Sequence, residues 1–529
     1  MLKLIVPGKS YENILVRGVN WIGDAVMTMP AIRALKLANP DSSITLLVKP
    51  WVSPLFEKNP NVDEIILYSN EYRGFTGRVK LARKLKEYNF DCAVLLQNAF
   101  DSAFVTFLAG IPERIGYSRD ARRFLLTKLV PFDGDVKSLH HIEYYLNLLV
   151  GSGFAAKKSE PWIYLSVEER LRARQRLKDL KRPIIAINPG ATYGSSKRWR
   201  TERFAEVARR IIGEIDGSAV ILGGPSEVAI AAEIVEILLR ARPDLASANR
   251  YLSRMAGMTG LRELITLISE SDILVTNDSG PMHIGYAVGT PVVAIFGSTS
   301  PALTGPCGDD SVVIRKEIEC SPCFERECKK GDLRCMDLVD PAEVFQAIEG
   351  LVKARKAVFF DRDGTLCKDP GYLNRMENLE IFPEIDGLKR LKQQGFSLIG
   401  VSNQSGIARE LVDEDFVKRV NRIFLDTFGF DGFYYCPHHP DERCSCRKPE
   451  PGLLLRARSE FDIDLKRSFV VGDKESDVLL AKAVGARSVF VKTGQESLSP
   501  HADFEARDLE EVVDIVLNCD RNDGSDRIV

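Results

Sequence analysis

Short apolar runs alternate with longer helical stretches along most of this 529-residue chain, and that alternation limits the possible folds more than any other feature. The runs ILVRG (14–18), ITLLV (44–48) and CAVLLQ (92–97) are typical of buried strands, and the segment AVMTMPAIRALKLA between two of them has helical spacing. Strand–helix alternation of this kind predicts an α/β protein in which helices cover both faces of parallel sheets. Further strands or strand–loop units are predicted at 64–68, 183–190, 219–225, 273–280, 291–297, 357–365, 396–406 and 468–477.

The alternation restarts twice, and the restarts predict the domain boundaries. A charged helical stretch, SVEERLRARQRLKDLKR, separates the first series from the second, and the third series begins at AVFFDRDGT. We therefore expect domains at 1–175, 176–353 and 354–500, followed by a C-terminal helix and tail at 501–529. A chain of this length fits about three domains of ordinary size.

Charge and composition exclude some classes of function. The 72 Lys and Arg residues nearly balance the 74 Asp and Glu residues, so we expect no nucleic-acid partner, because dedicated binders are usually strongly basic. No run approaches the ~18 apolar residues of a membrane span, and the N-terminal segment lacks a signal-peptide pattern. We expect a cytoplasmic protein with at most peripheral membrane contact. In such a chain, clustered cysteines indicate metal or redox chemistry.

The third series places two carboxylates at the end of its first strand. Asp361 follows the apolar run AVFF, and Asp363 comes two residues later beside a glycine that permits a sharp turn. One carboxylate can attack phosphorus and divide phosphoryl transfer into two steps, while the second can act as acid and then as base. If D-x-D stood alone, two aspartates in an ordinary turn would be the alternative. The full pattern of four apolar residues followed by D-x-D-G-T makes that alternative less favoured.

Further polar groups occur where the same site would need them. VSN (401–403) ends a strand with a hydroxyl and an amide suited to phosphate oxygens, and RK (447–448) offers positive charge to a phosphoryl group. VGDKESD (471–477) brings carboxylates to another strand end, where a hard oxygen ligand suits Mg²⁺. The predicted substrate contacts are Ser402, Asn403, Gln404, Arg447 and Lys448.

A loop between these motifs carries four metal-ligand side chains in the pattern C-x-H followed by C-x-C. This spacing can close a tetrahedral Zn²⁺ site that staples a short loop, and a group of reduced loop cysteines is the alternative. The zinc would be structural, because such a site has no open position, and it would fix the loop that presents Arg447. His439 could replace His438. The predicted ligands are Cys436, His438, Cys444 and Cys446.

This set resembles the haloacid dehalogenase-like (HAD) phosphatase superfamily over roughly residues 355–495, and the cysteine loop followed by RKP is similar to the D-glycero-D-manno-heptose 1,7-bisphosphate phosphatase family. The resemblance implies that Asp361 is the nucleophile, that Asp363 is the acid and base, and that Lys448 stabilises the phosphoaspartate. It also implies Mg²⁺ held by Asp361, by the Asp363 carbonyl and by Asp473. The family includes histidinol-phosphate phosphatases, so the substrate stays open between heptose bisphosphate and another phosphate ester.

The first two series carry weaker polar motifs. Asp24 lies near the start of the helix after the first strand, where a carboxylate can also simply cap the helix. NPGATYGSSKRW (188–199) opens a strand into a Gly/Ser/Thr-rich loop with Lys197, which suits a diphosphate. Glu227 follows another strand, where it could bind ribose hydroxyls, and TNDSGPMH (276–283) begins a helix whose N-terminus favours a leaving phosphate.

Together these motifs resemble the ADP-heptose:lipopolysaccharide heptosyltransferase family over roughly residues 12–350, and KRW with C-x-x-C-F resembles its heptosyltransferase II branch. The resemblance implies a GT-B pair of Rossmann-like domains that carries out inverting transfer from ADP-heptose to a lipopolysaccharide inner-core acceptor. It implies Asp24 as the base and no catalytic metal. A non-catalytic glycan-binding module is the alternative. The implied nucleotide-sugar contacts are Thr192, Lys197, Glu227, Asp278, Ser279, Gly280 and His283.

The sequence therefore predicts a bifunctional α/β enzyme, a GT-B pair followed by a HAD-like Rossmannoid phosphatase domain with a zinc loop. Two sets of residues stay without a predicted site. The basic residues of segment 114–128 could meet an anionic glycan or form a solvated face; they are Arg114, Arg119, Arg122, Arg123 and Lys128. Four further cysteines could bind a metal or form a reduced structural loop; they are Cys320, Cys323, Cys328 and Cys335.

Overall fold

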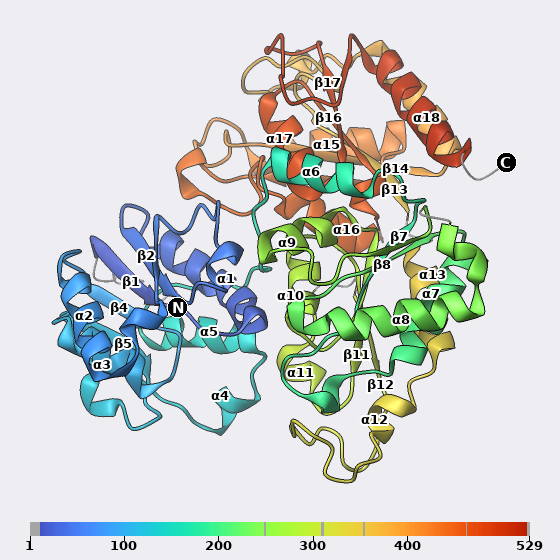
Figure 1. The fold of residues 1–529 in the computed structure, drawn as a ribbon. Coiled ribbons are helices and arrows are strands. Elements are labelled where there is room, and N and C mark those ends of the chain that lie inside the picture. The colour runs from blue at the N-terminus through green and yellow to red at the C-terminus, as the bar shows by residue number, and fades with distance from the viewer. Residues whose placement is uncertain (1–10, 248–249, 308–310, 353–354, 462, 526–529) are drawn as a thin grey trace. The chain divides into compact units, whose positions relative to one another are not determined.

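Six-stranded parallel sheets form the framework of this computed structural model, which describes residues 11–247, 250–307, 311–352, 355–461 and 463–525 (Figure 1). The chain divides into two compact units, Met1–Glu349 and Gly350–Val529. The first unit contains two of the sheets and the second contains one. The predicted boundary at 353/354 and the end of the predicted tail, 526–529, lie outside the described residues.

The first sheet has the strand order β3-β2-β1-β4-β5-β6. Its strands are β1 (Asn13–Arg17), β2 (Ser43–Val48), β3 (Glu64–Leu67), β4 (Cys92–Leu95), β5 (Glu113–Tyr117) and β6 (Lys128–Val130). The helices of this segment are α1 (Ile22–Ala38), α2 (Gly74–Lys86), α3 (Phe100–Leu108), α4 (Gly134–Ser138) and α5 (His141–Gly151).

The second sheet has the order β12-β11-β10-β7-β8-β9. Its strands are β7 (Ile184–Asn188), β8 (Ser218–Ile221), β9 (Leu252–Arg254), β10 (Ile273–Asn277), β11 (Val292–Phe296) and β12 (Val312–Arg315). Its helices are α6 (Val167–Leu177), α7 (Thr201–Glu214), α8 (Val228–Ala241), α9 (Leu261–Glu270), α10 (Gly280–Ala287), α11 (Pro301–Thr304), α12 (Arg334–Asp337) and α13 (Pro341–Val352).

The third sheet has the order β15-β14-β13-β16-β17-β18. Its strands are β13 (Lys356–Phe360), β14 (Phe396–Asn403), β15 (Gly432–Cys436), β16 (Phe469–Gly472), β17 (Arg487–Val491) and β18 (Phe504–Ala506). Its helices are α14 (Lys389–Gln393), α15 (Glu414–Phe428), α16 (Gly452–Phe461), α17 (Glu475–Val484) and α18 (Leu509–Ser525).

Burial on both faces explains why the central strands are apolar throughout. In β1, Ile14 and Val16 pack into one core with residues of α1 and α5, whereas Leu15 packs into a second core with residues of α2 and α3. Successive side chains of a strand point to opposite faces, so both faces of this sheet are covered. Within each sheet the register is parallel, as where Val16 of β1 pairs with Leu46 of β2 and Val94 of β4.

The predicted α/β class with parallel sheets is confirmed, and a strand occurs in each of the predicted runs. Seven strands were missed, namely β5, β6, β9, β12, β15, β17 and β18. Five of them are partly exposed edge strands, namely β6, β9, β12, β15 and β18, and such strands need less continuous apolar sequence than central ones. The other two, β5 and β17, lie one position inside the edge and are mostly buried, so exposure does not explain why they were missed.

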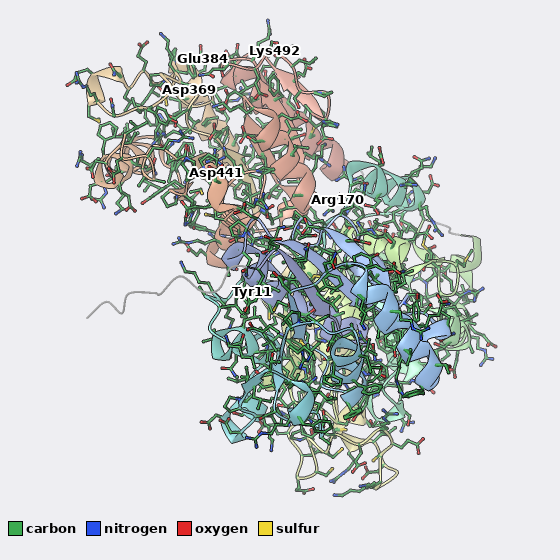
Figure 2. All side chains as sticks on the ribbon, turned by 90° about the vertical axis from the view of Figure 1, so that its left-hand side faces the viewer. Tyr11, Arg170, Asp369, Glu384, Asp441 and Lys492 are labelled. Carbon is green, nitrogen blue, oxygen red and sulfur yellow. The ribbon has the colours of Figure 1, made fainter. Side chains whose placement is uncertain are left out.

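A buried ion pair joins α6 to α9. Arg170 of α6, labelled in Figure 2, and Glu270 of α9 are almost fully buried, and Arg170 Nη1 lies 2.9 Å from Glu270 Oε1. Residue 175, the predicted end of the first domain, lies within α6.

Among the described residues, none of the helices combines the length and the apolar character needed to cross a membrane.

Candidate active sites

All three sheets share one topology, with the order of their strands reading 3-2-1-4-5-6 in chain order. The chain changes direction across each sheet between its first and fourth strands. In open α/β sheets, ligands bind outside the carboxyl ends of the strands at this point. The topology therefore predicts one ligand site in each sheet, at the carboxyl ends of β1 and β4, of β7 and β10, and of β13 and β16.

Buried carboxylates meet at the end of β13 and β16. Asp361 directly follows β13, Asp473 follows β16, and Asp477 lies in the first turn of α17. One potential ligand oxygen from each of these residues lies within 4.8 Å of the other two. The Lys448 ammonium lies 2.6 Å from Asp361 Oδ1 and 2.6 Å from Asp477 Oδ1, and it donates to the Val401 carbonyl at 3.0 Å.

The charges in this cluster do not balance. Burial raises the pKa of Asp361 to about 6, with Asp477 adding to the shift and Lys448 opposing it. Burial also raises the pKa of Asp473 to about 6. For Lys448, the two carboxylates outweigh burial and raise the pKa, so its charge is held. Three hard oxygen donors around one fixed ammonium are a donor set that fits a divalent cation such as Mg²⁺.

Glycine backbones pack against the Asp473 carboxylate. A Cβ atom on Gly494 would lie 1.8 Å from Asp473 Oδ2, and one on Gly364 would lie 2.4 Å from the same atom. Gly364 also has a φ of +96°, which side-chain-bearing residues rarely adopt. The position of this carboxylate therefore depends on two residues without side chains.

The Asp363 side chain is held outside the carboxylate cluster. Arg362 donates to both of its oxygens, at 3.0 and 2.8 Å, and Gln404 Nε2 donates to Oδ2 at 2.7 Å. Burial alone would raise the pKa of Asp363, but the Arg362 guanidinium and these hydrogen bonds outweigh burial and lower it. In this structure Asp363 is therefore ionised and can accept a proton.

The other predicted substrate contacts lie around the same point. Ser402 Oγ accepts a 2.7 Å hydrogen bond from Gln404 Nε2. Asn403 pins the backbone of Lys448, because its Oδ1 accepts from the Lys448 amide at 3.0 Å and its Nδ2 donates to the Lys448 carbonyl at 3.3 Å. Arg447 Nη1 is buried and makes no hydrogen bond to the described residues. This guanidinium is therefore available to a bound anion.

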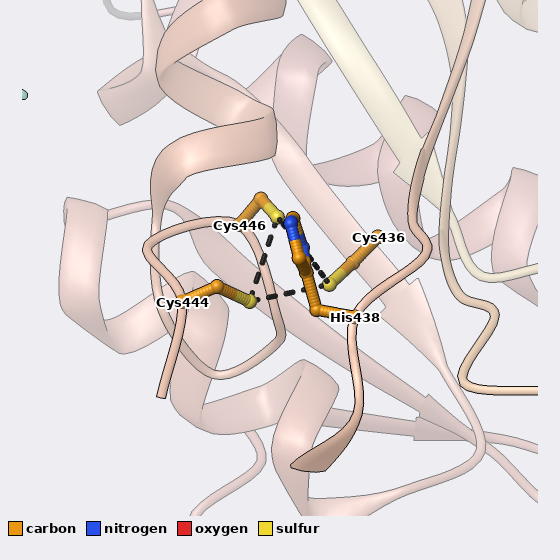
Figure 3. Close-up of side chains that lie close together, drawn as sticks. All are labelled: Cys436, His438, Cys444 and Cys446. Carbon is orange, nitrogen blue, oxygen red and sulfur yellow. Dashed lines mark hydrogen bonds between the residues drawn. The ribbon is translucent and has the colours of Figure 1, made fainter. Parts of the chain in front are cut away.

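The cysteine loop between β15 and α16 forms a compact four-atom cluster (Figure 3). Cys436 Sγ and Cys444 Sγ are 3.4 Å apart, Cys444 Sγ and Cys446 Sγ are 3.6 Å apart, and His438 Nδ1 lies 3.5 and 3.2 Å from the sulphurs of Cys436 and Cys446. Tetrahedral zinc with usual bond lengths would give edges of about 3.8 Å between sulphurs and about 3.5 Å between sulphur and nitrogen. The geometry therefore fits a Cys₃His metal site.

The alternative ligand His439 points elsewhere. It precedes the short helix η9 (Pro440–Glu442), and its Nδ1 accepts a hydrogen bond from the Asp441 amide at 3.4 Å. The structure thus brings His438, and not His439, to the three sulphurs.

In the first unit, the N-terminus of α1 packs against α10. A Cβ atom on Gly23 would lie 2.5 Å from the His283 ring, and Asp24 Oδ1 lies 3.3 Å from His141 Nδ1. His283 is buried, and its Nδ1 lies 3.0 Å from the Tyr286 hydroxyl. Burial lowers the pKa of His283 to about 4, so the ring is neutral.

The ends of β7 and β10 bring together several predicted nucleotide contacts. Lys197 Nζ lies 2.5 Å from Asp278 Oδ2, and both residues influence His283 electrostatically, as Asp24 does. The Asn277 side chain holds this loop by accepting from the Trp199 amide at 3.1 Å. A positive side chain thus lies at the carboxyl end of the second sheet, beside the buried histidine.

The remaining predicted contacts surround this group less closely. Glu227, at the end of the short helix η5 (Pro225–Glu227), lies against Gly190, where a Cβ atom would come within 2.3 Å of its Oε1. Ser279 immediately precedes α10, and its hydroxyl lies 3.2 Å from that of Thr276. Gly280 is the first residue of α10, and Thr192 is exposed on the loop after β7.

Sequence reasoning missed two residues that shape these sites. Arg362 lies between the two aspartates of D-x-D, and only its 1% side-chain exposure reveals that it points inward to Asp363. His141 follows another histidine at the start of α5, a weak signal that gave no indication of a contact with Asp24, 117 residues away.

One member of the basic segment 114–128 is not a surface residue. Arg122 is fully buried, and its guanidinium donates to Asn98 Oδ1 at 2.8 Å and to the carbonyls of Gln97 and Tyr117 at 2.5 and 3.2 Å. Arg122 therefore neither meets a glycan nor belongs to a solvated face. Its buried acceptors explain its position.

Comparison with known proteins gives a match for each unit. The model of glycosyltransferase family 9 (heptosyltransferase) matches residues 78–333. Lipopolysaccharide heptosyltransferase 2 of Escherichia coli (strain K12) is 31% identical over 354 residues, which cover 65% of this chain and 99% of that protein. The solved structure of E. coli ADP-heptose lps heptosyltransferase II covers 64% of this chain and 98% of that chain, with 29% identity and a TM-score of 0.55.

The second unit matches a different group of proteins. A HAD-hydrolase-like family model matches residues 445–518. The D-glycero-beta-D-manno-heptose-1,7-bisphosphate 7-phosphatase of Helicobacter pylori (strain J99) is 38% identical over 171 residues, which cover 31% of this chain and 98% of that protein. The protein of the same name from E. coli (strain K12) is 41% identical over 171 residues, with 30% and 88% covered.

Proposed function

Because the chain belongs to glycosyltransferase family 9 through its first unit and to the heptose-1,7-bisphosphate 7-phosphatases through its second, we propose that it is a bifunctional enzyme of lipopolysaccharide inner-core biosynthesis. One site transfers heptose from ADP-L-glycero-D-manno-heptose to the inner core with inversion. The other hydrolyses the 7-phosphate of D-glycero-D-manno-heptose 1,7-bisphosphate. The two steps are not consecutive, since the heptose 1-phosphate product must first gain a nucleotide, so transfer of an intermediate between the sites is not required.

In the phosphatase reaction, an oxygen of Asp361 attacks the 7-phosphorus, and the bond from phosphorus to the sugar oxygen breaks. Asp363 gives a proton to the leaving oxygen, then takes one from the water that hydrolyses the phosphoaspartate. A bound phosphate adds negative charge beside Asp363 and so opposes the Arg362 effect on its pKa, which favours the protonated form needed first. Lys448 stabilises the developing negative charge.

The metal sites of this unit are assigned on the same basis. Mg²⁺ would be held by Asp361, by the Asp363 carbonyl and by Asp473, and when bound it would neutralise charge on the phosphoryl oxygens. The cysteine cluster would hold a structural Zn²⁺. Only Arg447 separates its last ligand from Lys448, so a bound ion would fix the segment that carries both positive side chains.

The observation that carries the phosphatase proposal is the buried Lys448 ammonium between Asp361 and Asp477. The test is phosphate release from both anomers of heptose 1,7-bisphosphate, with and without Mg²⁺, and from histidinol phosphate. We expect Mg²⁺-dependent release from the bisphosphate. An Asp361→Asn protein should lose this activity and keep heptosyl transfer. Preference for histidinol phosphate would overturn the substrate, and equal loss of both activities would overturn the independence of the two sites.

In the transferase reaction, Asp24 would remove the proton from the acceptor hydroxyl as that oxygen attacks the anomeric carbon of the donor. Lys197, Thr192 and the loop 278–280 would stabilise the departing ADP without a metal. Support comes from the position of Asp24, whose partly exposed carboxylate lies at the start of α1 close to the buried His283.

The matched test uses Asp24→Ala and, as a control on an exposed turn, Asp41→Ala. We expect Asp24→Ala to bind ADP-heptose but not to release ADP in the presence of the acceptor, and Asp41→Ala to resemble the unsubstituted protein. If the unsubstituted protein consumes no ADP-heptose and both variants still bind the core glycan, the first unit is a binding module.

We also propose a cytoplasmic location with peripheral contact to an anionic membrane that carries the acceptor. The eleven cysteines all lie in the described part of the chain and none of them is in a disulfide, which fits a reducing compartment. On the first unit, Phe75 is 66% exposed, Phe100 42%, Phe107 47% and Phe124 75%. Phe75 lies in α2, which has five basic residues and no acidic one, and Phe100 and Phe107 lie in α3, which packs against α2. Exposed aromatic rings beside basic residues are typical of binding at an anionic lipid interface.

Sedimentation with vesicles tests this contact. Vesicles containing anionic phospholipid should carry the protein down at low salt, and neutral vesicles should not. Phe75→Ser together with Phe124→Ser should weaken the binding. Equal sedimentation with neutral vesicles, or no effect of the two substitutions, would contradict the proposal.

A further inference from the structure

We propose that Cys320, Cys323, Cys328 and Cys335 form a second thiolate metal site, which supports the loop of residues 193–197 in the transferase unit. The four cysteines line one cavity of about 240 Å³. They follow the pattern C-x₂-C-x₄-C-x₆-C between β12 and α13. The metal site itself is independent of the proposed function; its effect on transfer rests on that function.

The burial of these side chains is not that of packing residues. Cys335, in α12, is buried, but Cys323 is exposed, and Cys320 and Cys328 are half-buried. A cysteine kept only for packing is among the most buried residue types. Exposed and half-buried thiols around a common cavity therefore indicate chemistry at sulphur.

The four thiols face one cavity and have room to come closer. Their sulphurs are more widely spaced than the ligand atoms of the Cys436 cluster, which all lie within 4.8 Å of one another. Three of the four lie in segment 316–333, which contains neither helix nor strand, so small backbone movements can bring them to an ion.

The chemistry of the set favours a thiophilic ion. Four thiolates are typical of tetrahedral zinc or of iron bound by sulphur, and the Asp332 carboxylate lies beside the set, 3.9 Å from the Cys328 sulphur.

The cysteine segment holds the neighbouring loop through its own carbonyl groups. The Tyr193 hydroxyl donates to the Phe324 carbonyl at 2.7 Å, and the Ser196 amide donates to the Arg326 carbonyl at 3.1 Å. A Cβ atom on Gly194 would lie 2.1 Å from the same Arg326 oxygen. Residues 324–326 lie between Cys323 and Cys328, so an ion on these thiols would fix the carbonyls that position residues 193–196, directly before Lys197.

Metal analysis of the purified full-length protein tests the site without relying on activity. We expect two equivalents of zinc or iron per chain, one for each cysteine group, with the analysis reporting which element is present. Cys444→Ser, which leaves the second group intact, should retain one equivalent. Cys323→Ser combined with Cys328→Ser should also retain one, and Cys519→Ser, outside both groups, should retain two.

The decisive outcome does not depend on whether the variants of the proposed site fold. If Cys444→Ser retains no metal, or if the Cys323→Ser, Cys328→Ser protein binds as much as the unsubstituted one, the site does not exist. A charge-transfer band between thiolate and Co²⁺ in Cys444→Ser would support it independently. If the double variant loses one equivalent yet keeps its KM for ADP-heptose, the site stands and its support of the transferase loop is overturned.

Discussion

Removing the Lys448 ammonium should destabilise the second unit more strongly than any exposed charge does. Lys448→Met keeps most of the side-chain volume but leaves Asp361 and Asp477 buried without their common partner. The side chains of all three residues are at most 6% exposed, so water cannot replace the lost charge. The substitution therefore tests directly whether this ion pair network holds the site together.

The size of the effect follows from the two 2.6 Å contacts. At an effective dielectric constant of about 20, each contact corresponds to a Coulomb attraction of about 6 kcal/mol, most of which offsets the cost of burying the charges. Breaking a buried pair while leaving one partner usually costs about 3–5 kcal/mol. We expect that loss in the free energy of unfolding at pH 8. It should shrink toward pH 5, because the unpaired carboxylates, already shifted to high pKa by burial, take up protons there.

The assay can separate the two units optically. All four tryptophans, at positions 21, 51, 162 and 199, lie in the first unit. A urea transition seen by circular dichroism but not by tryptophan fluorescence therefore reports the second unit. Measurements without added Mg²⁺ and without chelator keep the cysteine cluster unchanged between samples.

Two further variants complete the test. Lys418→Met removes an exposed lysine of α15 and should cost no more than about 1 kcal/mol. Adding Asp361→Asn to Lys448→Met should restore much of the stability, because it removes one unpaired charge. Surface substitutions usually change the free energy of unfolding by no more than about 0.5 kcal/mol. A loss of that size or smaller in Lys448→Met would refute the reasoning.

Three other predictions concern single side chains. Gly494→Ala places a Cβ atom 1.8 Å from Asp473 Oδ2 and should lower the phosphatase kcat/KM by roughly 10²-fold. In the control Gly387→Ala the added Cβ meets open space, so kcat/KM should stay unchanged. Equal kcat/KM values for the two variants would contradict the packing argument. His283→Gln should make the stability of the first unit depend less on acid. The buried native ring has a pKa of about 4, whereas the unfolded chain binds a proton at this residue below about pH 6.5. The unsubstituted protein should therefore lose about 1.4 kcal/mol of stability per pH unit as the pH falls from about 6.5 to about 4, and it keeps its full stability above that range. Parallel pH profiles of the two proteins would count against a buried neutral ring. Arg122→Met should lower the stability of the first unit by about 3 kcal/mol in tryptophan-monitored unfolding, since it leaves several buried acceptors unpaired, and a change typical of surface sites would argue otherwise.

The fold was largely predictable because its central strands are buried on both faces. β7, with the sequence IIAIN, is buried at every position and gives a continuous apolar signal. β9 and β18, with the sequences LSR and FEA, are three residues long and partly exposed, and nothing in their composition distinguishes them from loops. The comparisons confirm the family predictions for both units. These predictions were possible because the motifs at the strand ends are short stretches of sequence with recognisable spacing.

The sites were predictable only where the residues are close in sequence. The four side chains of the cysteine cluster lie within eleven residues of sequence, so their spacing already predicted that they would come together. The contact between Asp24 and His141 joins α1 to α5, and the Arg362 side chain turns inward toward Asn421 of α15. Such contacts depend on how helices pack across a sheet, which periodicity does not reveal. The roles assigned to individual site residues stay predictions.

In the second unit, a single residue separates the cysteine cluster from the lysine at the carboxylate cluster. Cys446 belongs to the four-atom cluster, Arg447 follows, and Lys448 contacts the Asp361 carboxylate. Peroxide or another electrophile that removed Cys446 from the cluster would release the segment that carries Lys448, although it never touched Asp361 or Asp363. On the function proposed above, oxidative damage to this loop would then slow the supply of sugar precursor while the glycosyl transfer half of the same polypeptide kept working.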